Sequence, residues 1–198
     1  MTQKNKAITW LDMPEQDQLP EDVQTLFGKA EHALGEVPNV FRVFGIAPKH
    51  FMKWFKYYDY LMRNEDGDIT PEEREMIAVV VSTENRCEYC LGSHTAYLRG
   101  HNNDPIKTEL LSHNYRRAEL TTRERAMLDF AVKMTNDSEK MSPDDLEVLR
   151  SEGFSDEAIF DIAQVVAMFN FSNRMANALG WRPNESYYGD HRDYGKDT

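Results

Sequence analysis

Hydrophobic residues in this chain recur mostly at the spacing of a helix, and runs of alternating apolar and polar residues are few. The segment 20–35, PEDVQTLFGKAEHALG, predicts an amphipathic helix that Gly35 can end. An aromatic-rich stretch follows, and Pro48 divides it into a short helix and a longer one. These patterns predict an all-α fold, a helical bundle.

Two later segments begin with the signature of a capped helix. In residues 70–85, TPEEREMIAVVVSTEN, Thr70 suits the N-cap and Glu73 completes a capping box, so the apolar run predicts a fully buried helix rather than a strand. The segment TTRERAMLDFAV from Thr121 has the same cap and keeps Thr, Glu, Arg and Met in register with the first. The match suggests an internal pseudo-repeat in which only the first copy carries cysteines.

The C-terminal third continues the helical pattern. Residues 142–153 predict a short helix and residues 155–180 a long one, each ending in glycine. Within the long helix, IAQVVAMFN resembles IAVVVSTEN of the earlier segment, which aligns Asn170 with Asn85.

The domain organisation follows from these boundaries. A chain of 198 residues with 40% hydrophobic content is long enough for one sizeable core. We expect residues 1–19 to form an N-terminal extension and residues 20–181 one helical domain. Residues 182–198 are polar and aromatic without period, and we expect a tail that becomes ordered against a neighbouring subunit.

Charge narrows the range of partners. The chain has 34 acidic and 23 basic residues, a net charge of -11, which repels nucleic acid and anionic membrane surfaces. No apolar run approaches the roughly 20 residues of a membrane span, and the first 20 residues lack the apolar core of a signal peptide. We therefore expect no nucleic-acid or membrane partner and a cytoplasmic location, where a Cys-x-x-Cys pair is more often catalytic or metal-binding than structural.

The stretch CEYCLGSH, residues 87–94, holds the chain's two cysteines. On a helix, Cys87, Cys90 and His94 would share one face. Helical neighbours have Cβ atoms about 5–6 Å apart, and a disulfide needs about 3.5–4.5 Å, so the turn must tighten to form a bond that is easily reduced. His94 lies one turn from Cys90 and favours Cys90 as the activated thiol, whereas Arg86 and the nearby helix start favour Cys87. The residues leave this choice open.

Three acidic residues are candidates to orient His94, namely Glu75, Glu84 and Glu88. In one straight helix Glu75 would lie about 18 Å from Cys87, too far to assist. A turn near residues 85–86 would bring Glu75 back beside the cysteines and the histidine.

Other interpretations of the cysteine pair are weaker. The remaining histidines show no paired spacing, so a structural zinc site lacks its other ligands. Haem attachment needs histidine directly after the second cysteine, where Leu91 stands. Two inert, buried cysteines remain an alternative. We expect no resident metal or cofactor.

The segment EREMIAVVVSTENRCEYCLGSHTAYLRG resembles the core of the alkyl hydroperoxidase D and carboxymuconolactone decarboxylase superfamily. The resemblance extends over residues 20 to 181 and is to the superfamily's peroxidase-related branch. The segments that carry this extension are LGEVPNVFRVF, TTRERAMLDFA and residues 142–180. The resemblance implies an all-α fold, assembly into dimers, trimers or hexamers, and reduction of hydroperoxides by thiols. The reductant it implies is a dithiol, in some members carried by a lipoyl-bearing protein.

The resemblance also implies a role for each motif residue. Cys90 would attack the peroxide, His94 would be its base, Glu75 would relay a proton and Cys87 would resolve the oxidised product. Two positions depart from many relatives: Arg86 stands where glycine is common before the first cysteine, and Tyr89 where some members carry histidine.

Function is therefore expected to be thiol-dependent hydroperoxide reduction, in a pocket lined by aromatic residues. The candidates for its wall are Phe41, Phe44, Trp54, Tyr57 and Tyr58. A thiol-disulfide oxidoreductase or redox sensor, an oligomeric scaffold without activity, and a decarboxylase or lactone-acting enzyme are the alternatives. The cysteine pair argues against the last of these, because the decarboxylase members lack it.

Overall fold

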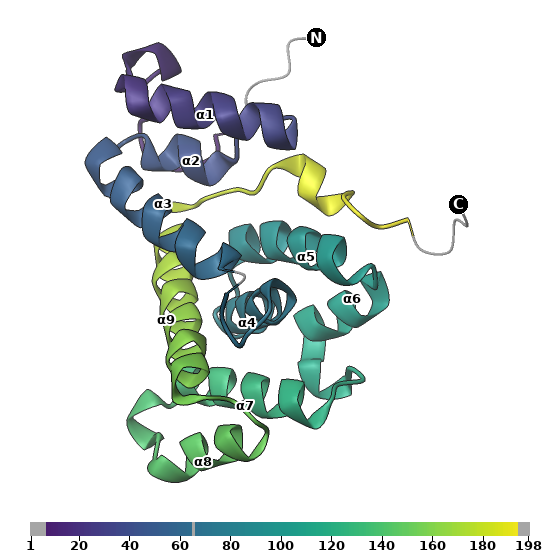
Figure 1. Ribbon diagram of the computed structural model, residues 1–198. Coiled ribbons are helices and arrows are strands. Elements are labelled where there is room, and N and C mark those ends of the chain that lie inside the picture. The colour runs from purple at the N-terminus through teal and green to yellow at the C-terminus, as the bar shows by residue number, and fades with distance from the viewer. Residues whose placement is uncertain (1–6, 65, 194–198) are drawn as a thin grey trace.

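The computed structural model describes residues 7–64 and 66–193, and every regular element in this range is helical. The all-α prediction is therefore confirmed. Figure 1 shows the arrangement, with α4 seen nearly end-on and the other helices around it. The helices are α1 (Glu21–Leu34), α2 (Asn39–Phe44), α3 (Pro48–Arg63), α4 (Pro71–Glu84), α5 (Glu88–Asn102), α6 (Pro105–Asn114), α7 (Thr122–Asn136), α8 (Pro143–Ser151) and α9 (Asp156–Leu179), with 3-10 turns η1 (Gln16–Gln18), η2 (Tyr115–Arg117), η3 (Ser138–Lys140) and η4 (Glu185–Tyr188).

Helix α4 forms the centre of the fold. Its residues 74–82 are all buried, and α5, α6, α7 and α9 contact it. A helix that is covered on every side needs an apolar surface all round, which explains the IAVVV run without amphipathic period. The chain also brings the two aligned asparagines into contact, because the Asn85 amide donates to Asn170 Oδ1 at 3.0 Å.

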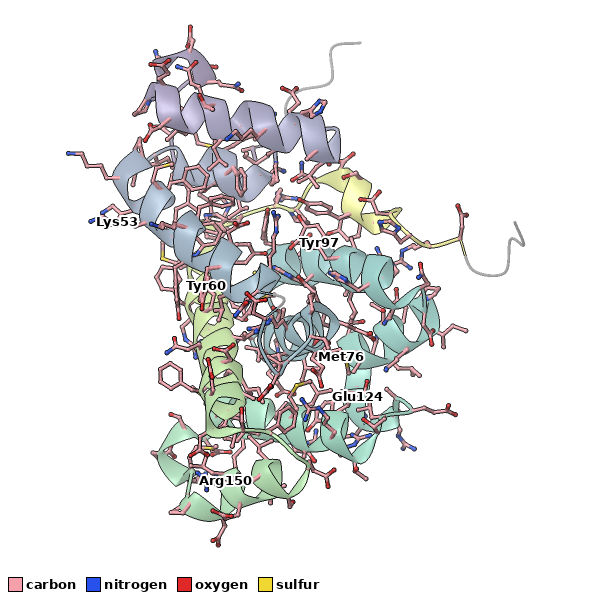
Figure 2. All side chains as sticks on the ribbon, in the orientation of Figure 1. Lys53, Tyr60, Met76, Tyr97, Glu124 and Arg150 are labelled. Atoms are coloured by element: carbon pink, nitrogen blue, oxygen red, sulfur yellow. The ribbon has the colours of Figure 1, made fainter. Side chains whose placement is uncertain are left out.

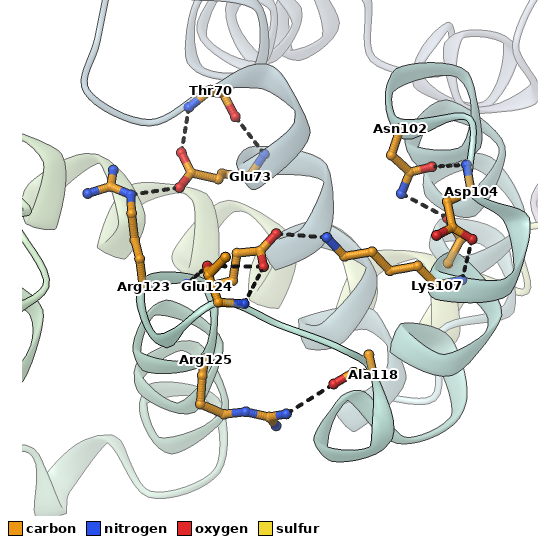
Figure 3. Close-up of polar contacts among 11 residues, drawn as sticks. Thr70, Glu73, Asn102, Asp104, Lys107, Ala118, Arg123, Glu124 and Arg125 are labelled. Atoms are coloured by element: carbon orange, nitrogen blue, oxygen red, sulfur yellow. Dashed lines mark hydrogen bonds and ion pairs between the residues drawn. The ribbon is translucent and has the colours of Figure 1, made fainter.

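Both predicted capping boxes are present, and their glutamates also join helices. Thr70 and Glu73 exchange hydrogen bonds at the start of α4, as Thr121 and Glu124 do at the start of α7. Glu73 additionally accepts a hydrogen bond from Arg123 at 3.0 Å, and Glu124 accepts one from Lys107 of α6 at 2.8 Å (Figure 3). The capped ends of α4 and α7 are thereby fixed to their neighbours.

Two apolar clusters divide the core. The larger surrounds α4 and includes residues of α7 and α9, and the smaller joins α1, α2 and α3 to the two cysteines and Trp181. Aromatic rings dominate the smaller cluster, for example Phe41 and Phe51 with ring centroids 5.1 Å apart. The cysteine motif lies where the two clusters meet.

Residues 182–193 lie along α5 of the same chain (Figure 1), so the prediction that the tail becomes ordered only against a neighbouring subunit is wrong for this segment. The buried Arg99 donates to the carbonyl oxygens of Tyr187 at 2.7 Å and Asp190 at 2.8 Å. At Gly92, an added Cβ would lie 2.9 Å from Pro183, so the segment packs closely only because α5 lacks a side chain there. The remainder of the predicted tail, residues 194–198, and the start of the predicted N-terminal extension, residues 1–6, lie outside the described residues.

Candidate active site

A tight turn between α4 and α5 assembles the site. Asn85 ends α4, and Arg86 adopts the left-handed conformation with φ +52°. The amide of Cys87 then donates to Ser82 O at 2.9 Å, which reverses the chain. The turn lies where the sequence predicts it, and its conformation explains why glycine suits the position before the first cysteine.

The reversal brings Glu75 of α4 against His94 of α5. His94 Nδ1 lies 2.6 Å from Glu75 Oε2, and the two side chains are only 7% and 8% exposed. A carboxylate can only accept, so Nδ1 donates and the neutral ring keeps its lone pair on Nε2. Nε2 forms no hydrogen bond with a described residue, and His94 lines a cavity. This nitrogen can therefore take a proton from a group in that cavity.

The other acidic candidates lie elsewhere. Glu84 accepts a hydrogen bond from Asn136 at 2.8 Å, and Glu88 accepts one from Tyr188 at 3.4 Å on the outer side of α5. Among the three acidic residues that the sequence proposes, Glu75 is thus the partner of His94.

The two cysteines occupy different positions relative to α5. Cys87 is the N-cap of the helix rather than a member of it, and the backbone N–H of Cys90 donates to its sulfur at 3.4 Å. Cys90 lies inside the helix, one turn before His94. The predicted stripe of three helical residues is therefore correct only for Cys90 and His94. Both thiols are free and buried.

Hydrogen bonds distribute the negative charge of the pair unequally. The thiol of Cys90 donates to Cys87, which lowers the pKa of Cys87; the N–H groups of Cys90 and Tyr89 and the Asn173 amide lower it further, against the effect of burial. Donation to Cys87, burial, and the negative charge on Cys87 raise the pKa of Cys90 well above the ordinary thiol value. These hydrogen bonds favour Cys87 over Cys90 as the site of the pair's first negative charge.

Asn173 of α9 supports both sulfurs, a role that the sequence does not reveal. It is fully buried, accepts a hydrogen bond from Asn85 at 2.9 Å and donates to Ser82 at 3.0 Å. Its amide also lowers the pKa of both thiols. A polar residue on the buried side of an apolar helix is the signal that could have identified it.

A cavity of about 60 Å³ opens onto Cys90, Ser93 and His94. One water molecule needs roughly 10–15 Å³ on this measure, so the space exceeds a single water. Cys87 is absent from the lining, so among the described residues the accessible sulfur is that of Cys90. The walls are mainly aromatic, and Figure 2 places one member, Tyr97, on α5.

The predicted aromatic wall is partly correct. Phe41, Trp54 and Tyr58 line the cavity, whereas Phe44 stacks on Trp54 with ring centroids 4.4 Å apart and Tyr57 donates to Gln164. The sequence does not single out the other aromatic residues in the wall, which are Phe55, Tyr89, Tyr97, Phe169 and Trp181.

Within the described residues, no helix is both long and apolar enough to cross a membrane. Likewise, no three metal-ligating side chains come together in that part of the chain.

A cysteine one turn from a histidine that a carboxylate orients is an arrangement that can activate a thiol as a nucleophile. Comparison with known proteins gives the family. The model of the carboxymuconolactone decarboxylase family matches residues 48–105, which run from α3 to the start of α6. A crystal structure of an alkylhydroperoxidase AhpD core, an uncharacterised peroxidase-related protein from Ralstonia eutropha JMP134, is 40% identical, with a TM-score of 0.91 and coverage of 94% of this chain and 98% of that one.

Further structures agree. An uncharacterised peroxidase-related protein from Silicibacter sp. TM1040 is 44% identical, with a TM-score of 0.91 over 97% of this chain and 100% of that one. The chain therefore belongs to the carboxymuconolactone decarboxylase and alkyl hydroperoxidase D-like family, as its motif indicates. The debrominase Bmp8 shares the fold at 20% identity, with a TM-score of 0.73 over 93% of this chain and 96% of that one.

A curated relative matches over a shorter region. Human Sestrin-2 is 31% identical over 71 residues, which are 36% of this chain and 15% of that protein. The chain thus spans only a small part of that relative's length.

Proposed function

We propose that the protein is a thiol-dependent hydroperoxide reductase. The observation that carries the proposal is that Cys90 and His94 face one cavity while the buried Glu75 holds the His94 ring from behind. A thiol needs a base to become a nucleophile near neutral pH, and this arrangement supplies one.

The unequal charge on the two cysteines defines the order of proton transfers. His94 takes one proton from the dithiol, and the proton that remains is shared between Cys87 and Cys90. Its usual place is on Cys90, because Cys87 is the better anion. When the shared proton moves to Cys87, Cys90 becomes the thiolate, and only its sulfur lines the cavity.

The Cys90 thiolate then attacks the terminal oxygen of the hydroperoxide. The O–O bond breaks, a sulfenic acid forms on Cys90, and the alkoxide takes the proton from His94 to leave as an alcohol. The thiol of Cys87 condenses with the sulfenic acid, which forms a disulfide and releases water. An external dithiol, free or carried on a lipoyl-bearing protein, returns both cysteines to thiols.

The cavity wall favours an organic hydroperoxide over hydrogen peroxide. Most of its lining residues are aromatic or aliphatic. An apolar substituent gains free energy by leaving water for such a wall, whereas hydrogen peroxide has none to bury.

Stopped-flow oxidation of the fully reduced protein tests the proposal. Cumene hydroperoxide and hydrogen peroxide are compared on the wild type, Cys90→Ser and Cys87→Ser. We expect the wild type to react far faster than free cysteine and to prefer cumene hydroperoxide, Cys90→Ser to lose the fast reaction, and Cys87→Ser to react once and stop. A wild-type rate no greater than that of free cysteine would end the proposal.

One observation favours a second function, thiol-disulfide exchange. Cys87 sits at a helix N-cap with a lowered pKa, an arrangement that suits a dithiol oxidoreductase. Cys87 is nevertheless fully buried and does not line the cavity, which limits attack on a protein disulfide. A rate with a dithiol-disulfide probe that exceeds the peroxide rate would favour this alternative.

A further inference from the structure

Tyr58 of α3 lines the same cavity as Cys90 and His94, where the proposed reaction with the peroxide takes place. Its ring stacks on Trp54 with centroids 5.0 Å apart at 17°, and meets the edge of His94 at 6.4 Å and 67°. These contacts hold the Tyr58 ring beside His94, the proposed acceptor of the thiol proton.

The Tyr58 hydroxyl has no structural partner. It forms no hydrogen bond with any other described residue, although the neighbouring tyrosines of the site are bonded: Tyr89 accepts from the Val40 amide at 3.0 Å and Tyr97 contacts Tyr187 at 3.2 Å. Phenylalanine at this position would make the same ring contacts with Trp54 and His94. Among the described residues, the hydroxyl therefore adds no hydrogen bond that holds the fold together.

The hydroxyl also stays protonated. Burial is the main cause that raises the pKa of Tyr58 well above its ordinary value, and the negative charge of Glu75 is the next. A neutral phenol is a hydrogen-bond donor at any pH at which the thiols react. The Tyr58 hydroxyl is thus a neutral donor in this cavity, whose lining also holds the unpartnered indole N–H groups of Trp54 and Trp181, and its ring is the one of the three that contacts His94.

We propose that Tyr58 is a catalytic residue. Its hydroxyl donates a hydrogen bond to the peroxide oxygen that departs when the Cys90 thiolate attacks the terminal oxygen. This inference rests on the proposed function. As sulfur bonds to the terminal oxygen and the O–O bond breaks, the remaining oxygen gains the electron pair and becomes an alkoxide. Tyr58 stabilises that charge through its O–H, and the proton itself comes from His94, so tyrosine ends the step as it began. An oriented donor at a developing oxyanion is among the larger contributions to catalysis.

Two peroxides with different leaving groups test the role. Cumene hydroperoxide releases an alkoxide, which needs stabilisation, whereas perbenzoic acid releases a carboxylate, which does not. Single-turnover rates with both are measured on the wild type, Tyr58→Phe and Tyr57→Phe. Tyr57 is a matched control because it precedes Tyr58 on α3 and its hydroxyl bonds to Gln164 outside the cavity.

We expect Tyr58→Phe to slow cumene hydroperoxide about tenfold to hundredfold and perbenzoic acid by less than about threefold, from the usual contribution of an oxyanion donor. Tyr57→Phe should leave both rates unchanged, and all three proteins should unfold at similar temperatures. Equal slowing of the two peroxides by Tyr58→Phe, or slowing of neither, would overturn the role of Tyr58 alone. A wild type no faster than free cysteine with either peroxide would overturn the hydroperoxide reductase together with this role.

Discussion

Replacing Glu75 by glutamine tests the charge that holds His94. Glutamine has nearly the same shape and can accept the hydrogen bond from Nδ1, so the ring keeps its position. It cannot stabilise the positive charge that His94 acquires on taking the thiol proton. The change therefore removes one interaction, and mainly in the protonated state of the histidine.

The magnitude follows from the bond itself. The 2.6 Å bond is buried, with both side chains under 10% exposed, so solvent screens it little. A hydrogen bond to a charged group is worth about 1.5–3 kcal/mol and a neutral one about 0.5–1.5 kcal/mol. The difference, about 1–2 kcal/mol, corresponds to a rate lower by about 5- to 30-fold at about 1.36 kcal/mol per factor of ten. Stability should change by less than about 1 kcal/mol, because the lost bond strength is offset by no longer burying a carboxylate.

The assay is stopped-flow oxidation by cumene hydroperoxide, together with urea unfolding of the same samples. Glu84→Gln and Glu88→Gln are the controls, because both residues flank the motif but bond elsewhere. We expect both controls to react at the wild-type rate. A Glu75→Gln rate within twofold of wild type, or equal slowing in a control, would refute the reasoning.

Three other changes probe the site's surroundings. Because Cys90 and the helix amides donate hydrogen bonds to Cys87, the Cys87 thiol should ionise below the ordinary thiol pKa. The ultraviolet absorbance of this thiolate at low pH should disappear in Cys87→Ser. If the absorbance persists in that variant, the charge lies on Cys90 instead. As the pKa of folded Cys87 is lowered, its contribution to stability exists above the pKa of an unfolded thiol and is lost as pH falls through the folded value, which urea unfolding across pH can follow. Arg86→Gly should raise the free energy of unfolding by about 0.5 kcal/mol, since relief of left-handed strain outweighs the entropy of glycine, and a clear loss in urea unfolding would contradict this. Asn173→Leu removes one hydrogen-bond partner each from Asn85 and Ser82 in a buried site. It should lower the free energy of unfolding by about 2 kcal/mol and should raise the pKa of both thiols; an unchanged urea midpoint would argue against the network.

Local signals explain what the sequence predicts well. A capping box needs only four residues, so the starts of α4 and α7 are visible without any knowledge of the fold. The same kind of signal exists at α6, where Asp104 accepts from the Lys107 amide and Pro105 is the first helical residue, but the hydrophobic pattern by itself does not predict that helix. The pairing of Glu75 with His94 could be anticipated, because one turn at residues 85–86 is enough to bring them together.

Contacts between distant segments explain what the sequence leaves undetermined. Phe169 and Trp181 enter the cavity wall from α9 and the segment after it, far from the cysteines along the chain. The order of residues 182–193 depends on Arg99, whose guanidinium bonds to carbonyl oxygens that carry no side-chain signal. The place of Cys87 at the cap depends on the left-handed Arg86, a conformation that arginine rarely adopts.

The site of the first sulfenic acid tests the account's central claim most directly. The reduced protein and its Cys87→Ser variant are mixed with one equivalent of cumene hydroperoxide in the presence of dimedone, and the adduct is located by mass spectrometry of peptides. The account predicts an adduct on Cys90 in the variant, and in the wild type a Cys87–Cys90 disulfide that outcompetes dimedone. An adduct on Cys87 in the wild type, with Cys90 unmodified, would contradict it, because the buried N-cap thiol and not the cavity thiol would then be the nucleophile.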